Sequence, residues 1–175
     1  MKKLQRIGAA ALMTAALFFS SCGSDDSGGS STPSGTYIKA TVDGTAWQTF
    51  EIQGNSVATA LKTGTGDGTL IMIQGGGDMN GSTAMSINMM GITSTGTYNV
   101  NPDSDGTTLA YIETGNSMSY DTSNCAGATG TITITAYDDT KVEGTFSFVG
   151  KVDEDCNMTK TVTNGSFRGV YMQSN

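Results

Sequence analysis

The segment Gly130–Gly150 constrains the fold of this chain more than any other stretch. Apolar and polar residues alternate from Ile132 to Ala136 and again from Val142 to Phe148, with a short polar stretch between the two runs. A period of two is typical of a β-strand that buries one face. The segment therefore predicts a β-hairpin.

The register of this hairpin follows if both apolar sets share one face. Ile134 then pairs with Phe146 and Ile132 pairs with Phe148. This pairing leaves residues 139–141 as a three-residue loop. A four-residue loop would require a β-bulge in one of the strands.

The rest of the chain repeats this pattern in short runs separated by turn residues such as Gly, Asn and Asp. The further runs cover residues 37–42, 45–52, 57–61, 69–73, 85–89, 96–100, 108–112, 118–120 and 159–172. In the last run the alternation changes phase, so Asn164–Gly165 predicts a bulge or turn. The fold class is all-β: an antiparallel meander of about ten strands that forms a two-sheet sandwich or a flattened barrel.

The N-terminus has the pattern of an export signal. Basic residues at positions 2, 3 and 6 precede Ile7–Phe19, an apolar run of thirteen residues. A bilayer requires about 20 apolar residues in a spanning helix, so this run predicts a signal peptide, residues 1–21. Ser20 and Ser21 lie directly before Cys22, which resembles a bacterial lipobox and implies lipidation of Cys22. The alternative is an ordinary secretory signal followed by a chance cysteine.

The remaining chain divides into a tether and one domain. Residues 22–35 are rich in Ser and Gly and predict a flexible tether after the lipidated cysteine. Residues 36–175 are long enough for a single β domain with its own core. We therefore expect a protein held at the outer membrane by lipid, at the cell surface or on the periplasmic face.

The net charge limits the classes of binding partner, and the cysteine count limits the possible disulfides. Of the nine basic residues three precede Cys22, which leaves six against sixteen acidic residues and a net charge of −10. Such a surface disfavours nucleic acid and anionic headgroups, although an acidic balance also serves solubility. With Cys22 lipidated, Cys125 and Cys156 remain as a predicted disulfide near the open end of the hairpin strands.

Several strand and turn segments together resemble a known family. They are TyrIleLysAlaThrValAspGlyThrAlaTrp (37–47), GlyThrTyrAsnVal (96–100), GlyThrIleThrIleThrAlaTyrAsp (130–138), ValGluGlyThrPheSerPhe (142–148) and ThrAsnGlySerPhe (163–167). This combination is similar to the small exported lipoproteins of Bacteroidetes grouped as DUF6252, a family of unknown function. Asp25 and Asp26 resemble the acidic surface-export signal of such lipoproteins. The resemblance implies a lipid-anchored β domain and supplies no catalytic residues.

Candidate site residues are few. The chain has no histidine, which excludes a Ser-His-Asp triad, and we predict no catalytic residue, metal site or cofactor. Trp47, Tyr98 and Tyr111 are candidates for ligand contact, although buried strand aromatics are the commoner case. Acidic residues form the remaining candidates: Asp103 and Asp105 for calcium, and Asp138, Asp139, Asp153, Glu154 and Asp155 for carboxylate catalysis.

Three functions remain open. The first is a non-catalytic binding or envelope module that presents its surface to a glycan or an envelope protein. The alternative is a calycin-like carrier that encloses a small apolar ligand. The third is a carboxylate-based glycan hydrolase. An exposed aromatic row, a closed apolar cavity, or a cleft with two carboxylates of raised pKa would respectively favour each function.

Overall fold

The computed structural model describes residues 35–172. Apart from two short 3-10 turns, η1 (Gly66–Gly68) and η2 (Thr114–Asn116), its regular elements are β-strands. The all-β prediction is therefore confirmed. The strands are β1 (Tyr37–Val42), β2 (Thr45–Gln48), β3 (Glu51–Ile52), β4 (Asn55–Ser56), β5 (Thr59–Thr63), β6 (Leu70–Gly76), β7 (Thr83–Met90), β8 (Gly96–Val100), β9 (Thr108–Glu113), β10 (Met118–Asp121), β11 (Thr129–Tyr137), β12 (Lys141–Val152) and β13 (Asp155–Val170).

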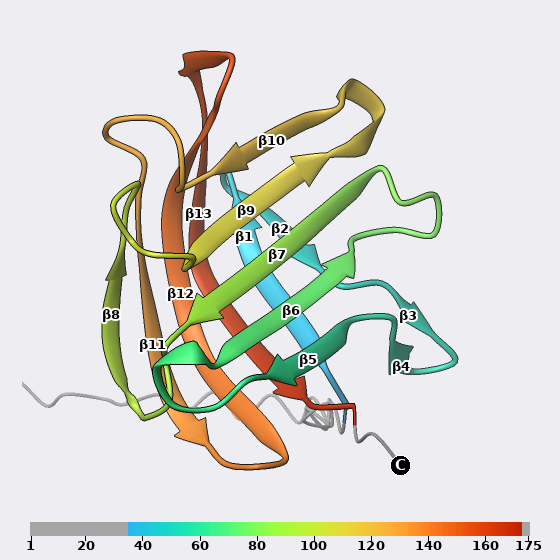
Figure 1. The fold of residues 1–175 in the computed structure, drawn as a ribbon. Coiled ribbons are helices and arrows are strands. Elements are labelled where there is room, and N and C mark those ends of the chain that lie inside the picture. The colour runs from blue at the N-terminus through green and yellow to red at the C-terminus, as the bar shows by residue number, and fades with distance from the viewer. Residues whose placement is uncertain (1–34, 173–175) are drawn as a thin grey trace, which may run out of the picture. The chain divides into compact units, whose positions relative to one another are not determined.

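Most strands belong to one large antiparallel sheet that curls into two layers. Its order is β2-β1-β13-β12-β10-β9-β7-β6-β5, and β11 adds to β12 and carries β8 on its other edge. We call β5, β6, β7, β9 and β10 the front layer, and β1, β2, β8, β11, β12 and β13 the back layer. The strands of the two layers cross each other in Figure 1. The short strands β3 and β4 form a separate two-stranded sheet.

The central hairpin forms, but its predicted register is wrong by two residues. Ile132 pairs with Phe146 and Ile134 with Gly144, and the ladder then shifts at a bulge around Thr135. The turn is tighter than expected, because the Asp138 N–H donates to the Lys141 carbonyl oxygen at 3.0 Å. The slip of two residues keeps Ile132 and Ile134 on the predicted buried face. Beyond the bulge the phase changes, because Ala136 pairs with the partly exposed Glu143, so the prediction that Ala136 shares the buried face is wrong.

Two strand pairings depart from a simple meander. β8 does not pair with β7 or β9, its neighbours along the chain, but with β11. β1 pairs with β2 on one edge and with β13, the last strand, on the other. The two ends of the described chain are therefore joined within the back layer.

The two layers meet again at the C-terminus. Ala60 of β5 and Tyr171 form a parallel bridge, and the Met172 N–H donates to the Ala60 carbonyl oxygen at 3.3 Å. At the opposite end of β12, Lys151 pairs with Asp121 of β10. The curled sheet is thus connected at two corners.

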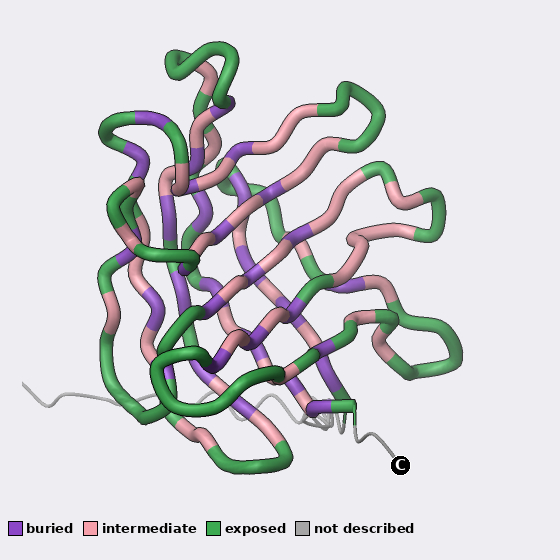
Figure 2. Tube along the Cα trace, in the orientation of Figure 1, coloured by how far each residue is buried: buried purple, intermediate pink, exposed green. Residues whose placement is uncertain are grey.

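The core between the layers is filled by side chains. Buried residues alternate with more exposed ones along the strands, and the exposed residues gather in the loops (Figure 2). A Cβ atom added at Gly169 would lie 2.8 Å from Ile73 Cδ1, and one added at Gly144 would lie 2.9 Å from Phe167 Cζ. The two layers therefore approach too closely at Gly169 to admit even a methyl group, and within the back layer the Phe167 ring fills the space beside Gly144.

The predicted irregularity at Asn164–Gly165 is confirmed as a bulge in β13. Asn164 has a positive φ of 51°, and the pairing with β12 slips between Phe146 and Phe148. A Cβ atom at Gly165 would lie within 2.6 Å of the Phe146 ring, so only glycine fits beside it.

Candidate functional site

Two of the three predicted ligand-contact aromatics lie in one hollow. Trp47 of β2 and Tyr111 of β9 both line it, although 64 positions separate them in the sequence. We call this hollow the aromatic pocket; it has a volume of about 260 Å³ and is lined by Val42, Asp43, Thr45, Ala46, Trp47, Tyr111 and Lys160.

The indole of Trp47 is held in place by the protein itself. Its Nε1–H donates to Thr83 Oγ1 at 3.0 Å, and the side chain is only partly exposed. Gly77 lies against the indole so closely that an added Cβ would overlap with Nε1. Trp47 therefore packs as a structural residue against β6 and β7, and its polar atom already has a partner.

The charges beside the aromatic pocket are also paired. Lys160 Nζ lies 3.2 Å from both Asp43 Oδ2 and Glu113 Oε1, and 5.6 Å from the centroid of the Tyr120 ring. The hydrogen bond to Glu113, followed by that to Asp43, raises the pKa of Lys160. The pKa of Asp43 is lowered, chiefly because its carboxylate accepts the Thr161 N–H. Lys160 thus shares its single positive charge between two carboxylates, and each of the three groups has an ionic partner within the protein.

Tyr111 and Tyr98 contribute little open polar surface. Burial is the main cause that raises the pKa of Tyr111, whose side chain is buried against the core. Tyr98 lies on β8, away from the aromatic pocket, and its hydroxyl bonds to Ser94 at 3.0 Å. The three aromatics therefore do not form a row.

The acidic candidates serve local turns. Asp138 Oδ1 accepts the N–H groups of Thr140 and Lys141, and the Thr140 hydroxyl bond is the largest cause that lowers the pKa of Asp138. In the loop after β8 the Asp103 N–H donates to Asn101 Oδ1. Within residues 35–172 no three His, Cys, Asp or Glu side chains gather closely enough to hold a metal ion.

The predicted disulfide between Cys125 and Cys156 is confirmed, with Cα atoms 5.6 Å apart. Its place differs from the prediction, because Cys156 lies at the start of β13 rather than on the second hairpin strand. The bridge ties the loop after β10 to the β12–β13 turn. By the chain-entropy relation, a bridge between cysteines 31 positions apart stabilises the fold by about 3 to 4 kcal/mol.

Two further hollows lie on the back layer, on the side that faces away from the front layer. Because side chains alternate along these strands, every second residue points outward, and along the face these outward residues are uncharged. The row that contains Gly130 and its cross-strand partners points inward, since a Cβ at Gly130 would lie 2.8 Å from Leu109 Cδ1 of the front layer. We call the outward set the threonine face. Its residues are Thr97, Asn99 and Asn101; Thr129, Thr131 and Thr133; Thr145, Ser147 and Val149; and Thr161, Thr163 and Ser166.

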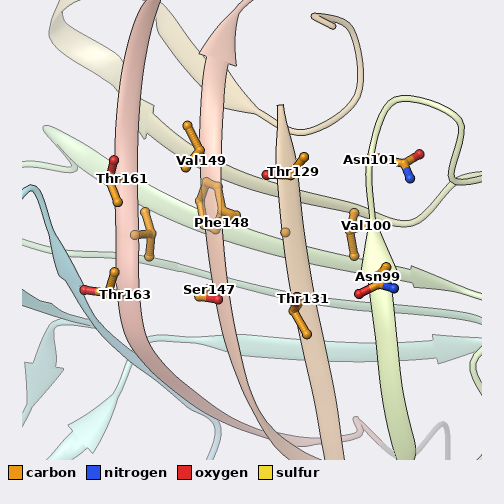
Figure 3. Close-up of a pocket in the computed structure, with 12 residues that line it drawn as sticks. Asn99, Val100, Asn101, Thr129, Thr131, Ser147, Phe148, Val149, Thr161 and Thr163 are labelled. Atoms are coloured by element: carbon orange, nitrogen blue, oxygen red, sulfur yellow. The ribbon is translucent and has the colours of Figure 1, made fainter. Parts of the chain in front are cut away.

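Two adjacent hollows cross the threonine face. The first has a volume of about 500 Å³ and runs from Asn99 of β8 and Asn101 directly after it to Thr161 and Thr163 of β13. Its lining residues belong to or adjoin β8, β11, β12 and β13, and Figure 3 shows how they lie side by side. The second hollow, of about 540 Å³, lies alongside. The two share Thr131, Ser147 and Thr163 at their common boundary.

The floor of the first hollow is a row of inward-pointing residues. Gly130 pairs with Val100 on one side and with Phe148 on the other, and Phe148 pairs with Val162. Phe148, Val100 and Val162 are buried in the core. The bottom of the hollow is therefore backbone that core packing holds rigid, and its walls are side chains with hydroxyl groups.

The hydroxyls along the shared boundary have no partner inside the described part of the chain. Thr131, Ser147 and Thr163 form no side-chain hydrogen bond there, whereas Thr97 and Thr133 at the margin bond to each other at 3.1 Å. A hydroxyl donates one hydrogen bond and accepts others. The threonine face thus offers water or a ligand a dense set of neutral donors and acceptors.

Sequence reasoning missed this face because threonine is an ordinary strand residue. The usable signal was alternation: Thr129, Thr131 and Thr133 on one strand, and Thr161 with Thr163 on another. To recognise that these residues form one surface, one must also know which strands lie side by side. That pairing, especially of β8 with β11, is not local in the sequence.

Of the comparisons with known proteins, the one with family models gives a match. No helix within residues 35–172 is long and apolar enough to cross a membrane. No curated protein and no solved structure matches the chain. The model of the family described as "Domain of unknown function (DUF6252)" matches residues 34–171, which is most of the chain. The chain therefore belongs to the DUF6252 family.

Proposed function

We propose that this protein is an outer-membrane lipoprotein whose β domain is a non-catalytic binding module, with the threonine face as its binding surface. The anchor is supported by the sequence around Cys22, which lies outside the described residues. Binding is supported by one observation above all: two adjoining hollows whose shared boundary carries hydroxyls without a partner in the described part of the chain.

The packing of the core favours binding on the outside rather than in the interior. A carrier of an apolar ligand requires an internal cavity, yet Ile73, Ala60 and Phe167 fill the space next to Gly169 and Gly144. The described hollows instead open to the surface.

The carboxylates support binding rather than hydrolysis. A glycan hydrolase requires one carboxyl group with a raised pKa to act as the acid. In the described part the pKa is instead lowered for Asp43, Asp78 and Asp138, chiefly because each carboxylate accepts hydrogen bonds from nearby N–H or hydroxyl groups.

The anchor is tested by replacing Cys22 with Ala in cells that make the full chain. We expect the wild-type protein in the outer-membrane fraction, with mass spectrometry showing lipid on Cys22, and the variant released in soluble form. Protease treatment of unbroken cells then distinguishes the cell surface from the periplasmic face. An unmodified thiol at position 22 would overturn the anchor.

The binding surface is tested with lysine substitutions in the full-length protein. Thr131→Lys and Ser147→Lys place a charge between the two hollows, while Thr59→Lys and Gln74→Lys place the same charge on exposed positions of the front layer. The probes are purified envelope polysaccharide and purified outer-membrane protein from the same cells. We expect both face variants to lose binding and both front-layer controls to keep it. Equal binding by all four variants would overturn the assignment of the face.

A further inference from the structure

We infer that the ligand of the threonine face is a neutral glycan chain that lies across strands β8, β11, β12 and β13. This inference rests on the proposed function, because it requires that the face binds a ligand. It adds the chemical class of that ligand and the direction in which it lies.

The first argument is charge. Neither hollow is lined by a charged residue, although the chain after residue 21 has a net charge of −10. Charged side chains lie around the hollows instead. On the same strands, Glu143 accepts from Lys141 at 2.8 Å and lies 3.4 Å from Arg168 Nε, and Lys151 donates to the Ala126 carbonyl at 2.8 Å. On the neighbouring strand β1, Lys39 pairs with Ser166 at the margin of the second hollow. An ionic ligand would find no opposite charge inside the hollows, so the ligand that fits is neutral.

The second argument is the kind of contact that the walls offer. They carry hydroxyl and amide groups, with Val149 as the one outward apolar side chain of the threonine face and no exposed aromatic ring. Protein interfaces depend on buried aromatic and arginine anchors, which this surface lacks. A sugar presents hydroxyls that both donate and accept, and it therefore matches hydroxyls such as Thr131 and Ser147.

The third argument is shape. Adjacent strands lie about 4.8 Å apart, and alternate residues on one strand about 6.8 Å apart, so the outward side chains form parallel rows across the strands. The first hollow runs between two such rows, from Asn99 on β8 to Thr163 on β13. This repeat, together with a second hollow alongside, suits an extended chain of similar units better than one compact molecule.

The same geometry predicts how affinity depends on length. Each neutral hydrogen bond contributes only about 0.5 to 1.5 kcal/mol net, and no aromatic ring adds stacking energy. Single sugars should therefore bind weakly. Longer oligosaccharides should bind more tightly until they reach from β8 to β13.

The experiment uses the full-length protein in detergent, run by affinity electrophoresis through gels that contain a defined polysaccharide. The neutral probes are glucans, mannans and galactans, and the charged probe is alginate. The double variant Thr131→Val with Thr163→Val removes two hydroxyls and keeps the side-chain shape. Thr59→Val on the exposed edge of the front layer is the matched control. We expect retardation by at least one neutral glycan, at least tenfold weaker binding in the double variant, and wild-type binding in the control.

The outcomes separate this inference from the proposed function. If alginate or outer-membrane protein binds through the face and no neutral glycan does, the glycan inference falls and the binding module remains. If neutral glycans bind equally well to the double variant, the face is not their site and both fall. If affinity does not rise from one sugar to several, the chain-like ligand lying across the strands is wrong.

Discussion

The aromatic pocket and the threonine face show opposite uses of polar residues. The pocket contains the residue types that draw attention in a sequence, a tryptophan, a tyrosine, a lysine and an aspartate, yet Trp47, Lys160 and Asp43 each have a partner inside the protein. The threonine face contains only ordinary strand residues, yet the hydroxyls of Thr131 and Ser147 have none within residues 35–172. Unsatisfied hydrogen-bonding capacity, rather than conspicuous residue type, distinguishes the surface that is available for a ligand.

The largest expected effect comes from the pocket. Trp47→Ala removes a partly buried indole and its hydrogen bond to Thr83, and should lower the free energy of unfolding by about 2 to 3 kcal/mol. Urea unfolding measures the loss. A variant as stable as the wild type would show that the indole is not a packing residue, and the contrast between the two regions would fail.

The next effect concerns the charges. Lys160→Met leaves Asp43 and Glu113 close together without their shared cation, and should cost about 1 kcal/mol, because surface ion pairs of this kind are weak. Lys151→Met is the control, since its ammonium meets a backbone carbonyl. The cost should shrink in high salt. If it stays constant as salt is added, packing rather than charge accounts for the role of Lys160.

A smaller effect should appear as a dependence on pH. The pKa of Asp43 is lowered from 3.8 in the folded protein, so its carboxylate stabilises the fold above that pH, and the contribution is lost as the pH falls through the folded pKa. Thermal unfolding between about pH 5 and pH 2 should show a gap between wild type and Asp43→Asn that closes toward the acid end. Because the side chain is nearly half exposed, the gap should be small. A gap that persists at the acid end would assign the effect to something other than ionisation.

The smallest effect on stability should come from the threonine face. Thr131→Val and Ser147→Ala change exposed or half-exposed hydroxyls that bond to nothing in the described protein, and should alter the free energy of unfolding by less than about 0.5 kcal/mol. Urea unfolding alongside Trp47→Ala gives the comparison directly. A loss of more than about 1 kcal/mol would mean that these hydroxyls are structural after all.

The sequence predicted faces well and pairings poorly. Ile132 and Phe146 were placed on the buried side, and they are buried, because the period of two survives a slip of two residues. The slip itself could not be foreseen, since the bulge at Thr135 lies in an unbroken threonine-isoleucine repeat with no glycine to mark it. The strand that pairs with β8 could not be foreseen either, because the lengths of the loops around it are uncertain from the sequence.

The candidate site shows the same limit. Two cysteines left over after Cys22 were enough to predict the disulfide, because few pairings are possible. The meeting of Trp47 with Tyr111, and the side-by-side arrangement of Thr131 with Asn99, depend on contacts between distant parts of the chain. Such contacts are set by the packing of the entire core, which no single stretch encodes.

The pairing of β1 with β13 bears on how the molecule is made. β1 has two neighbours in the sheet, β2 on one edge and β13 on the other. The edge that faces β13 can pair only after β13 has been made. The sheet therefore cannot be completed during synthesis until β13 has been made, and non-local pairing of this kind folds slowly. The edge of β1 that β13 covers therefore stays open until nearly all of the described domain has been synthesised.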